Sequence, residues 1–311
     1  MAGVAKATAR VERLNARSLP TLLEREQILG YVLLAPAVFY ILALIGYPTL
    51  LALWIALSDQ TVSGGSEGFV GLANFQWAVD SSLFRRALTN TLVFTFGSEI
   101  IKMVLGTTLA FLLIRNFKGR KVARSLVIIP WAMPIAISVI AWRWMFDALY
   151  SVINWTGVHL GLIQNPPNWL GGPDTAMWAI IMVNVWRGFP FSAIILMAGL
   201  TSIPQDILDA ARVDGASWWQ RYRQVIVPMI APILYIALLF SLVFTFTDMT
   251  VVYLLTRGGP VNSTHVLSSL AFDIGIVAGG LSRGAAISLF LLPALLAMAL
   301  WLLRLLKRRD I

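Results

Sequence analysis

The chain has 311 residues, of which 58% are hydrophobic and only 13% are charged. Soluble domains contain about a quarter charged residues, so this composition excludes an ordinary soluble protein and indicates a membrane protein. The absence of cysteine excludes disulfides, thiol catalysis and thiolate metal sites.

Six apolar stretches are long enough to cross a bilayer, which needs about twenty helical residues. They are residues 30–57, 88–114, 122–146, 174–200, 229–256 and 284–306. The first is too long for the core of a cleaved signal peptide, and we expect it to remain as an anchor. The sequence therefore predicts an all-α membrane protein with six transmembrane helices. Its membrane domain spans residues 30–306, between tails at 1–29 and 307–311.

Basic residues predict the orientation of the spans. The two tails and the connections 115–124 and 212–223 hold most of the 24 lysines and arginines. An even number of crossings with these segments on one side predicts that both termini are cytoplasmic. The net charge of +9 is then a topology signal, and we expect no nucleic-acid partner.

Charged residues inside the second span require a partner, because polar groups are costly within a bilayer. Glu99 and Lys102 lie three residues apart on one helical face. This spacing favours an internal ion pair, or a contact with a partner subunit, over a proton relay.

The fourth span contains an unusual polar segment in mid-sequence. Gly188 and Pro190 should interrupt the helix there, which is tolerated where the freed backbone faces a cavity or packed protein. Arg187 offers hydrogen-bond donors in a planar fork that suits hydroxyl pairs or an anionic group. Asn184 and Phe191 add an amide and an apolar face.

In the fifth span, Ser241, Thr245 and Asp248 are spaced four and three residues apart and should share one helical face. Two interpretations stay open. These side chains line a site together with the fourth span, or Arg187 and Asp248 neutralise one another inside the bundle.

The connection 201–228 predicts two short helices. Ser202 is placed to cap the first, with Gln205 at the capping-box spacing. Gly215 should end this helix. A second short helix, 217–227, should then lead into the fifth span.

Within this connection, an acidic residue precedes two small residues, and Gly-Ala follows after three further residues. The residues are Asp209, Ala210, Ala211, Asp214, Gly215 and Ala216. This order resembles the EAA loop of ABC-importer permeases, with Asp209 where glutamate is usual. An ordinary amphipathic loop would leave the order unexplained. The resemblance implies a coupling helix seated in a cleft of an ATP-binding subunit, with Asp209 facing an arginine of that subunit.

Four further stretches are similar to maltose-type sugar permeases, and in particular to the first of the two paired permeases. They are residues 71–75, 130–134, 184–191 and 254–260. The resemblance implies the type I ABC importer permease fold in its six-span form, in a bacterial inner membrane. It also implies that Asn184, Arg187, Gly188, Phe191, Ser241, Thr245 and Asp248 line the transmembrane substrate site.

The resemblance further implies a function as the permease subunit of a binding-protein-dependent importer of a sugar or sugar derivative. The implied partners are a second homologous permease, two ATPase subunits, an extracytoplasmic solute-binding protein and the lipid bilayer. No phosphate-binding Gly-x-x-x-x-Gly-Lys-Ser/Thr segment is present, so ATP and magnesium should reside on the partner ATPases.

We expect no cofactor, metal or catalytic residue in this chain, because no nucleophile–base set or zinc motif is present. His159 and His265 should be ordinary solvated histidines in external loops. The alternative function is an ion-coupled secondary transporter or channel that works without ATPases. It would use Glu99, Lys102, Arg187 and Asp248 as its ion path.

Overall fold

The structure, a computed structural model, describes residues 26–307. Most of the predicted tail 1–29 and of the tail 307–311 lies outside this range. The chain divides into two compact units, of which the first ends at Trp54 and the second begins at Ile55. This division falls within the predicted membrane domain 30–306, whose bounds stay a prediction.

The described part of the first unit is an apolar helix with one wider turn, and its last turn continues into the second unit. α2 (Glu26–Ile41) passes through the π-helical turn η2 (Leu42–Gly46) into α3 (Tyr47–Ala56). The wider turn lies just before Pro48, which has no N–H for a regular helical bond. The apolar stretch Gly30–Ala56 has 27 residues and meets the length of the first predicted span.

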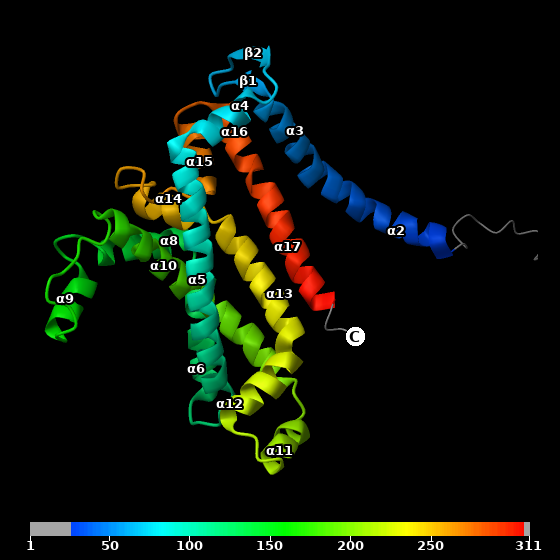
Figure 1. Cartoon of the computed structure of the whole chain (residues 1–311), viewed down its shortest axis with the longest axis vertical. Coiled ribbons are helices and arrows are strands. Elements are labelled where there is room, and N and C mark those ends of the chain that lie inside the picture. Colours follow the sequence, from blue (N-terminus) through cyan, green and yellow to red (C-terminus); the bar gives the residue numbers. More distant parts are fainter. Residues whose placement is uncertain (1–25, 308–311) are drawn as a thin grey trace, which may run out of the picture. The chain divides into compact units, whose positions relative to one another are not determined.

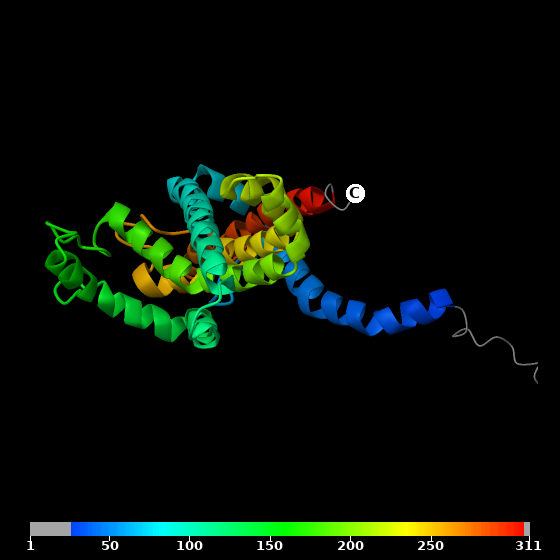
Figure 2. The same ribbon diagram turned by 90° about the horizontal axis from the view of Figure 1, so that it is seen from below.

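Three long helices lie side by side at the centre of the second unit (Figures 1 and 2). They are α5 (Ser82–Ile114), α10 (Pro173–Thr201) and α13 (Val227–Phe246). Ala110 of α5, Leu196 of α10 and Ile230 of α13 meet in one buried apolar cluster. This packing fixes the three helices against one another, and with them the polar side chains that they carry.

The third predicted span, 122–146, is wrong as a single helix. The chain forms α6 (Arg120–Val127), α7 (Ile129–Ala132) and α8 (Ile135–Met145), and the last segment is bent by 91° from the first two. Pro134 lacks an N–H and forces the preceding residue, Met133, into an extended conformation with ψ of 140°. Within residues 26–307, five helices are therefore long and apolar enough to cross a membrane, or six if the bent pair is one span.

The remaining predicted spans are confirmed as long apolar segments with wider bounds, and the fifth begins eleven residues earlier than predicted. They run over Ser82–Ile114, Pro173–Thr201, Trp218–Thr256 and Leu281–Lys307. The last consists of α16 (Leu281–Leu289) and α17 (Leu291–Lys307), and α14 (Thr250–Thr256) completes the one before it.

Most short elements of the second unit lie at its two ends, whereas α9 (Val152–His159) lies at one side (Figure 1). One end carries a hairpin in which Ser58 of β1 pairs with Phe69 of β2, while α11 and α12 lie at the opposite end (Figure 1). The hairpin strands are β1 (Ser58–Gln60) and β2 (Ser66–Phe69), and the other short elements are α4 (Ala73–Asp80), α9 (Val152–His159), α11 (Gln205–Val213), α12 (Trp218–Arg221), α15 (Leu267–Phe272) and the π-helical turns η3 (Tyr222–Ile226) and η4 (Asp273–Val277).

Candidate functional site

The seven residues predicted for a substrate site line one cavity of about 370 Å³ in the second unit. α10 and the end of α13 contribute most of its wall, and α5, α7, α8 and α14 complete it. The lining residues are Lys102, Trp131, Ile135, Asn184, Arg187, Gly188, Phe191, Ser241, Phe244, Thr245, Asp248 and Thr250. The structure therefore brings the two predicted polar segments together.

Asp248 lies at a break in the fifth span. α13 ends at Phe246 and α14 begins at Thr250, so the expectation that Asp248 continues the helical face of Thr245 is wrong. Asp248 Oδ1 accepts the backbone N–H groups of Thr250 at 2.9 Å and Val251 at 3.3 Å. The carboxylate replaces the helical carbonyl partners that the break removes, and this fixes its orientation.

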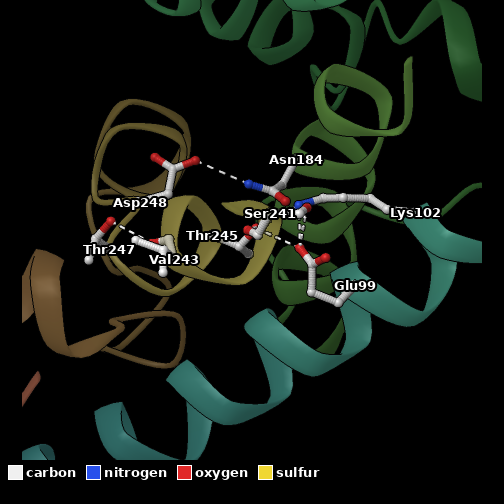
Figure 3. Close-up of polar contacts among 8 residues, drawn as sticks. All are labelled: Glu99, Lys102, Asn184, Ser241, Val243, Thr245, Thr247 and Asp248. Carbon is white, nitrogen blue, oxygen red and sulfur yellow. Dashed lines mark hydrogen bonds and ion pairs between the residues drawn. The ribbon is translucent and has the colours of Figure 1, made fainter. Parts of the chain in front are cut away.

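Across the cavity, Asn184 Nδ2 donates to Asp248 Oδ2 at 3.1 Å (Figure 3). Arg187 makes no ion pair with Asp248 within 4.0 Å in the part of the chain that the structure describes, so the two are not neutralised by direct contact. Arg187 Nε and Asn184 Oδ1 are buried without a hydrogen-bond partner. Such atoms are costly unless a ligand or water binds them.

A buried polar network lies behind this wall (Figure 3). Lys102 Nζ is 2.8 Å from Glu99 Oε1 and donates to Thr245 Oγ1 at 2.6 Å. The same carboxylate oxygen lies 2.9 Å from Ser241 Oγ and 2.8 Å from Thr245 Oγ1. The expected internal ion pair is therefore present. Its contact with the cavity through Lys102 was not expected from sequence.

Gly188 provides the space for Lys102. The predicted interruption at Gly188 and Pro190 is wrong, because α10 runs without a break from Pro173 to Thr201. A Cβ atom at Gly188 would lie only 2.8 Å from Lys102 Cε and 2.9 Å from Lys102 Cδ. Gly188 is therefore explained by close packing between α10 and α5. Pro190 lacks an N–H, and the hydrogen bonds of the neighbouring turns keep the helix continuous at this position.

An aromatic pair forms another part of the wall. Phe191 of α10 stacks on Trp131 of α7, with ring centroids 5.6 Å apart and planes 16° from parallel. Trp131 is not among the predicted site residues. Its sequence signal is its position between Pro130 and Pro134, since these prolines mark the break that turns α7 toward α10.

The second candidate site is the turn after α11, where the predicted helix–Gly–helix is confirmed. The N–H of Ala216 bonds the carbonyl of Ala211 at 3.0 Å, and the N–H of Gly215 bonds that of Arg212 at 3.0 Å. These two bonds form a Schellman motif. Gly215 has φ of +79°, a conformation that glycine adopts without strain.

The predicted caps of this connection need correction. Ser202 donates to the carbonyl of Gly199 at the end of α10 and does not cap α11. Ser217 instead forms a capping box with Gln220, and the helix that begins there continues through η3 into α13. The predicted short helix 217–227 is therefore the first part of one 39-residue segment, Trp218–Thr256.

α11 presents an exposed surface at the end of the second unit. Asp209, Ala210, Asp214 and Gly215 are exposed, and Ala211 and Ala216 are half-buried. Val213, an apolar side chain, is 87% exposed. Asp209 already pairs with Arg212 of the same helix at 2.5 Å, so its charge is balanced within the chain before any partner binds.

His265 is buried, and its predicted exposure is wrong. Its Nδ1 lies 3.1 Å from Ser269 Oγ, and Asn90 of α5 donates to the His265 carbonyl at 3.0 Å. Burial lowers the pKa of the imidazole, and the Asp273 carboxylate opposes this shift in part. The neutral ring therefore stabilises the loop at neutral pH, and this contribution falls as the pH drops below about 6.5. His159 is exposed, as expected.

The sequence of this chain is similar to those of known transport proteins. Residues 102–310 match the family described as binding-protein-dependent transport system inner membrane component. The trehalose/maltose transport system permease protein MalF of Thermococcus litoralis is 35% identical over 287 residues, which cover 92% of this chain and 96% of that protein. The trehalose transport system permease protein SugA of Mycobacterium tuberculosis is 31% identical over 275 residues, 88% and 87% of the two chains.

Solved structures give the same fold. A chain of a bacterial ABC transporter involved in the import of the acidic polysaccharide alginate superposes with a TM-score of 0.76. The match covers 92% of this chain and 97% of that chain at 23% sequence identity, so the likeness is one of fold.

Proposed function

Because the chain belongs to the family of binding-protein-dependent transport system inner membrane components, we propose that it carries a sugar or sugar derivative into the cell as a permease subunit of an ABC importer. The observation that carries the substrate assignment is the cavity between α10 and α13. It combines an aromatic wall with buried, unpartnered hydrogen-bonding atoms of Arg187 and Asn184. The C–H faces of a sugar can pack on the aromatic wall, and its hydroxyl groups can hydrogen-bond with Arg187 and Asn184.

The proposed substrate contacts come from two helices. Asn184, Arg187, Gly188 and Phe191 line the cavity from α10, and Ser241, Thr245 and Asp248 line it from α13 and the break that follows. The names of the relatives MalF and SugA, trehalose and maltose permeases, support a carbohydrate.

The turn after α11 is the proposed contact with the ATPase. This helix is exposed, contains small residues and presents the solvent-exposed apolar side chain of Val213, so it suits a cleft in another protein. In this arrangement Asp209 exchanges Arg212 for a basic group of the ATPase. ATP and magnesium are bound by that partner.

The proposed orientation of the chain in the membrane places the other parts of the assembly. α11 and the basic connection 115–124 face the cytoplasm, so both termini are cytoplasmic in a bacterial inner membrane. The hairpin end of the second unit then faces the solute-binding protein. A second, homologous permease completes the pathway, and specificity is shared with the binding protein.

The experiment is ATPase stimulation in the reconstituted complex of both permeases, ATPases and sugar-loaded binding protein. Gly215→Trp should abolish stimulation and transport while assembly persists, because no described residue other than the two chain neighbours has an atom within 4 Å of the new Cβ. Gly119→Trp is the matched control, since Gly119 also has a positive φ, +86°, and open space around it. Both changes carry a similar strain, about 1–2 kcal/mol.

Equal loss of stimulation in both variants would contradict the proposed contact. Uptake driven by an ion gradient, by this chain without ATPases, would contradict the importer function itself and favour the secondary transporter.

A further inference from the structure

Four ionisable groups surround the cavity, two of each sign. Lys102, Arg187 and Asp248 line it directly, and Glu99 lies behind Lys102. The formal charges therefore cancel. This balance needs Glu99, because the lining residues without it carry a net positive charge.

The Glu99–Lys102 pair is held rigidly. Both side chains are almost fully buried, with relative exposures of 4% and 3%. Glu99 Oε1 contacts Lys102, Ser241 and Thr245, and the Lys102 side chain lies in the space that Gly188, which has no Cβ, leaves beside it. Lys102 is thus occupied by groups of this chain, and its charge is already compensated.

We propose that Lys102, fixed and neutralised by Glu99, is a specificity-determining residue that makes the cavity select uncharged hydroxylated ligands over acidic ones. This inference rests on the proposed function of the cavity and names its substrate class. A neutral sugar can bind Arg187 Nε and Asn184 Oδ1, the buried atoms of the described cavity-lining residues that have no partner. An acidic ligand would lose its hydration, and Asp248 in the same cavity would repel it while Arg187 attracts it, because the charge of Lys102 is already taken up by Glu99.

The test compares maltose with its carboxylate analogue maltobionate, two ligands of similar size. Equilibrium binding of each radiolabelled ligand is measured on the assembled complex in lipid nanodiscs, without the solute-binding protein. The wild-type complex should prefer maltose. Glu99→Gln leaves Lys102 uncompensated, and the ratio of maltose to maltobionate affinity should fall by about tenfold or more.

A double variant that restores the charge balance of the cavity distinguishes a role in ligand specificity from a merely structural role. The double variant Glu99→Gln/Lys102→Met removes both charges and should regain the preference for maltose. Ser98→Ala is the matched control. Ser98 is buried on the same helix with an unpartnered hydroxyl outside the cavity, so its loss should leave the ratio unchanged.

The outcomes distinguish this inference from the proposed function. A wild-type complex that binds neither ligand contradicts both. A wild-type complex that prefers maltose, with the same ratio in Glu99→Gln, overturns the role of the ion pair alone. So does a double variant that behaves like the single one. If Glu99→Gln does not assemble, Lys102→Met gives the opposite imbalance, and it should disfavour maltobionate further.

Discussion

The cavity and the turn after α11 are stabilised by contacts of very different range. In the cavity, Lys102 and Thr245 bond over 143 positions of sequence, and Asn184 and Asp248 over 64. In the turn, the hydrogen bonds join residues three to five positions apart. A local contact is fixed by its own segment, whereas a long-range one depends on the packing of whole helices. Substitutions should therefore have coupled effects in the cavity and independent ones in the turn.

The largest loss of stability is expected from a substitution in the cavity, at Gly188. Gly188→Ala places a Cβ against Lys102 and displaces it from Glu99 and Thr245, so we expect a loss of about 2 kcal/mol in stability. The measurement is thermal unfolding of the purified complex. Gly97→Ala is the control, because its Cβ meets only Ile181 at an ordinary 3.5 Å. Equal behaviour of the two variants would show that Lys102 does not depend on the space left by Gly188.

A smaller effect is expected from coupling between Ser241 and Thr245. Both hydroxyls bind Glu99 Oε1, so Ser241→Ala and Thr245→Val should be non-additive by about 1 kcal/mol in a double-mutant cycle on stability. Purely additive losses would indicate that the carboxylate does not link the two hydroxyls.

The smallest effect is expected at Arg212 in the turn. Its ion pair with Asp209 is about half exposed on both sides, and such pairs contribute about 0–1 kcal/mol. Arg212→Ala should leave thermal unfolding nearly unchanged and should add independently to Ser217→Ala, which removes a helix cap. A loss as large as that of Gly188→Ala would contradict the local character of this region.

The same contrast explains what could be predicted from sequence. Gly215 ends α11 as expected, because a glycine after a short helix acts through its own backbone. The long apolar helices were predictable too, since hydropathy is a property of each segment. Ser202 was assigned to the cap of α11, but its hydroxyl bonds the Gly199 carbonyl at the end of α10, and Pro204 takes the N-cap position.

Features that depend on contacts between distant segments could not be predicted from the local sequence. That Lys102 reaches the cavity depends on the fit between α5 and α10, and Gly188 suggested a broken helix when it serves close packing. His265 looked solvated because its loop is rich in glycine and proline, yet Asn90 and Thr91 of α5 bind that loop and bury the ring. The seven cavity residues were named through resemblance, and their substrate role stays a prediction.

The continuity of the helix from Ser217 through η3 into α13 has a mechanical consequence. Only Asp214 to Ser217 separate α11 from this helix, and the Schellman motif and the capping box leave these residues little slack. Trp218 and Thr245 are separated by about 40 Å along the helix axis. A displacement of α11 is therefore transmitted by a stiff rod, and its far end carries the hydroxyl of Thr245 into the cavity wall.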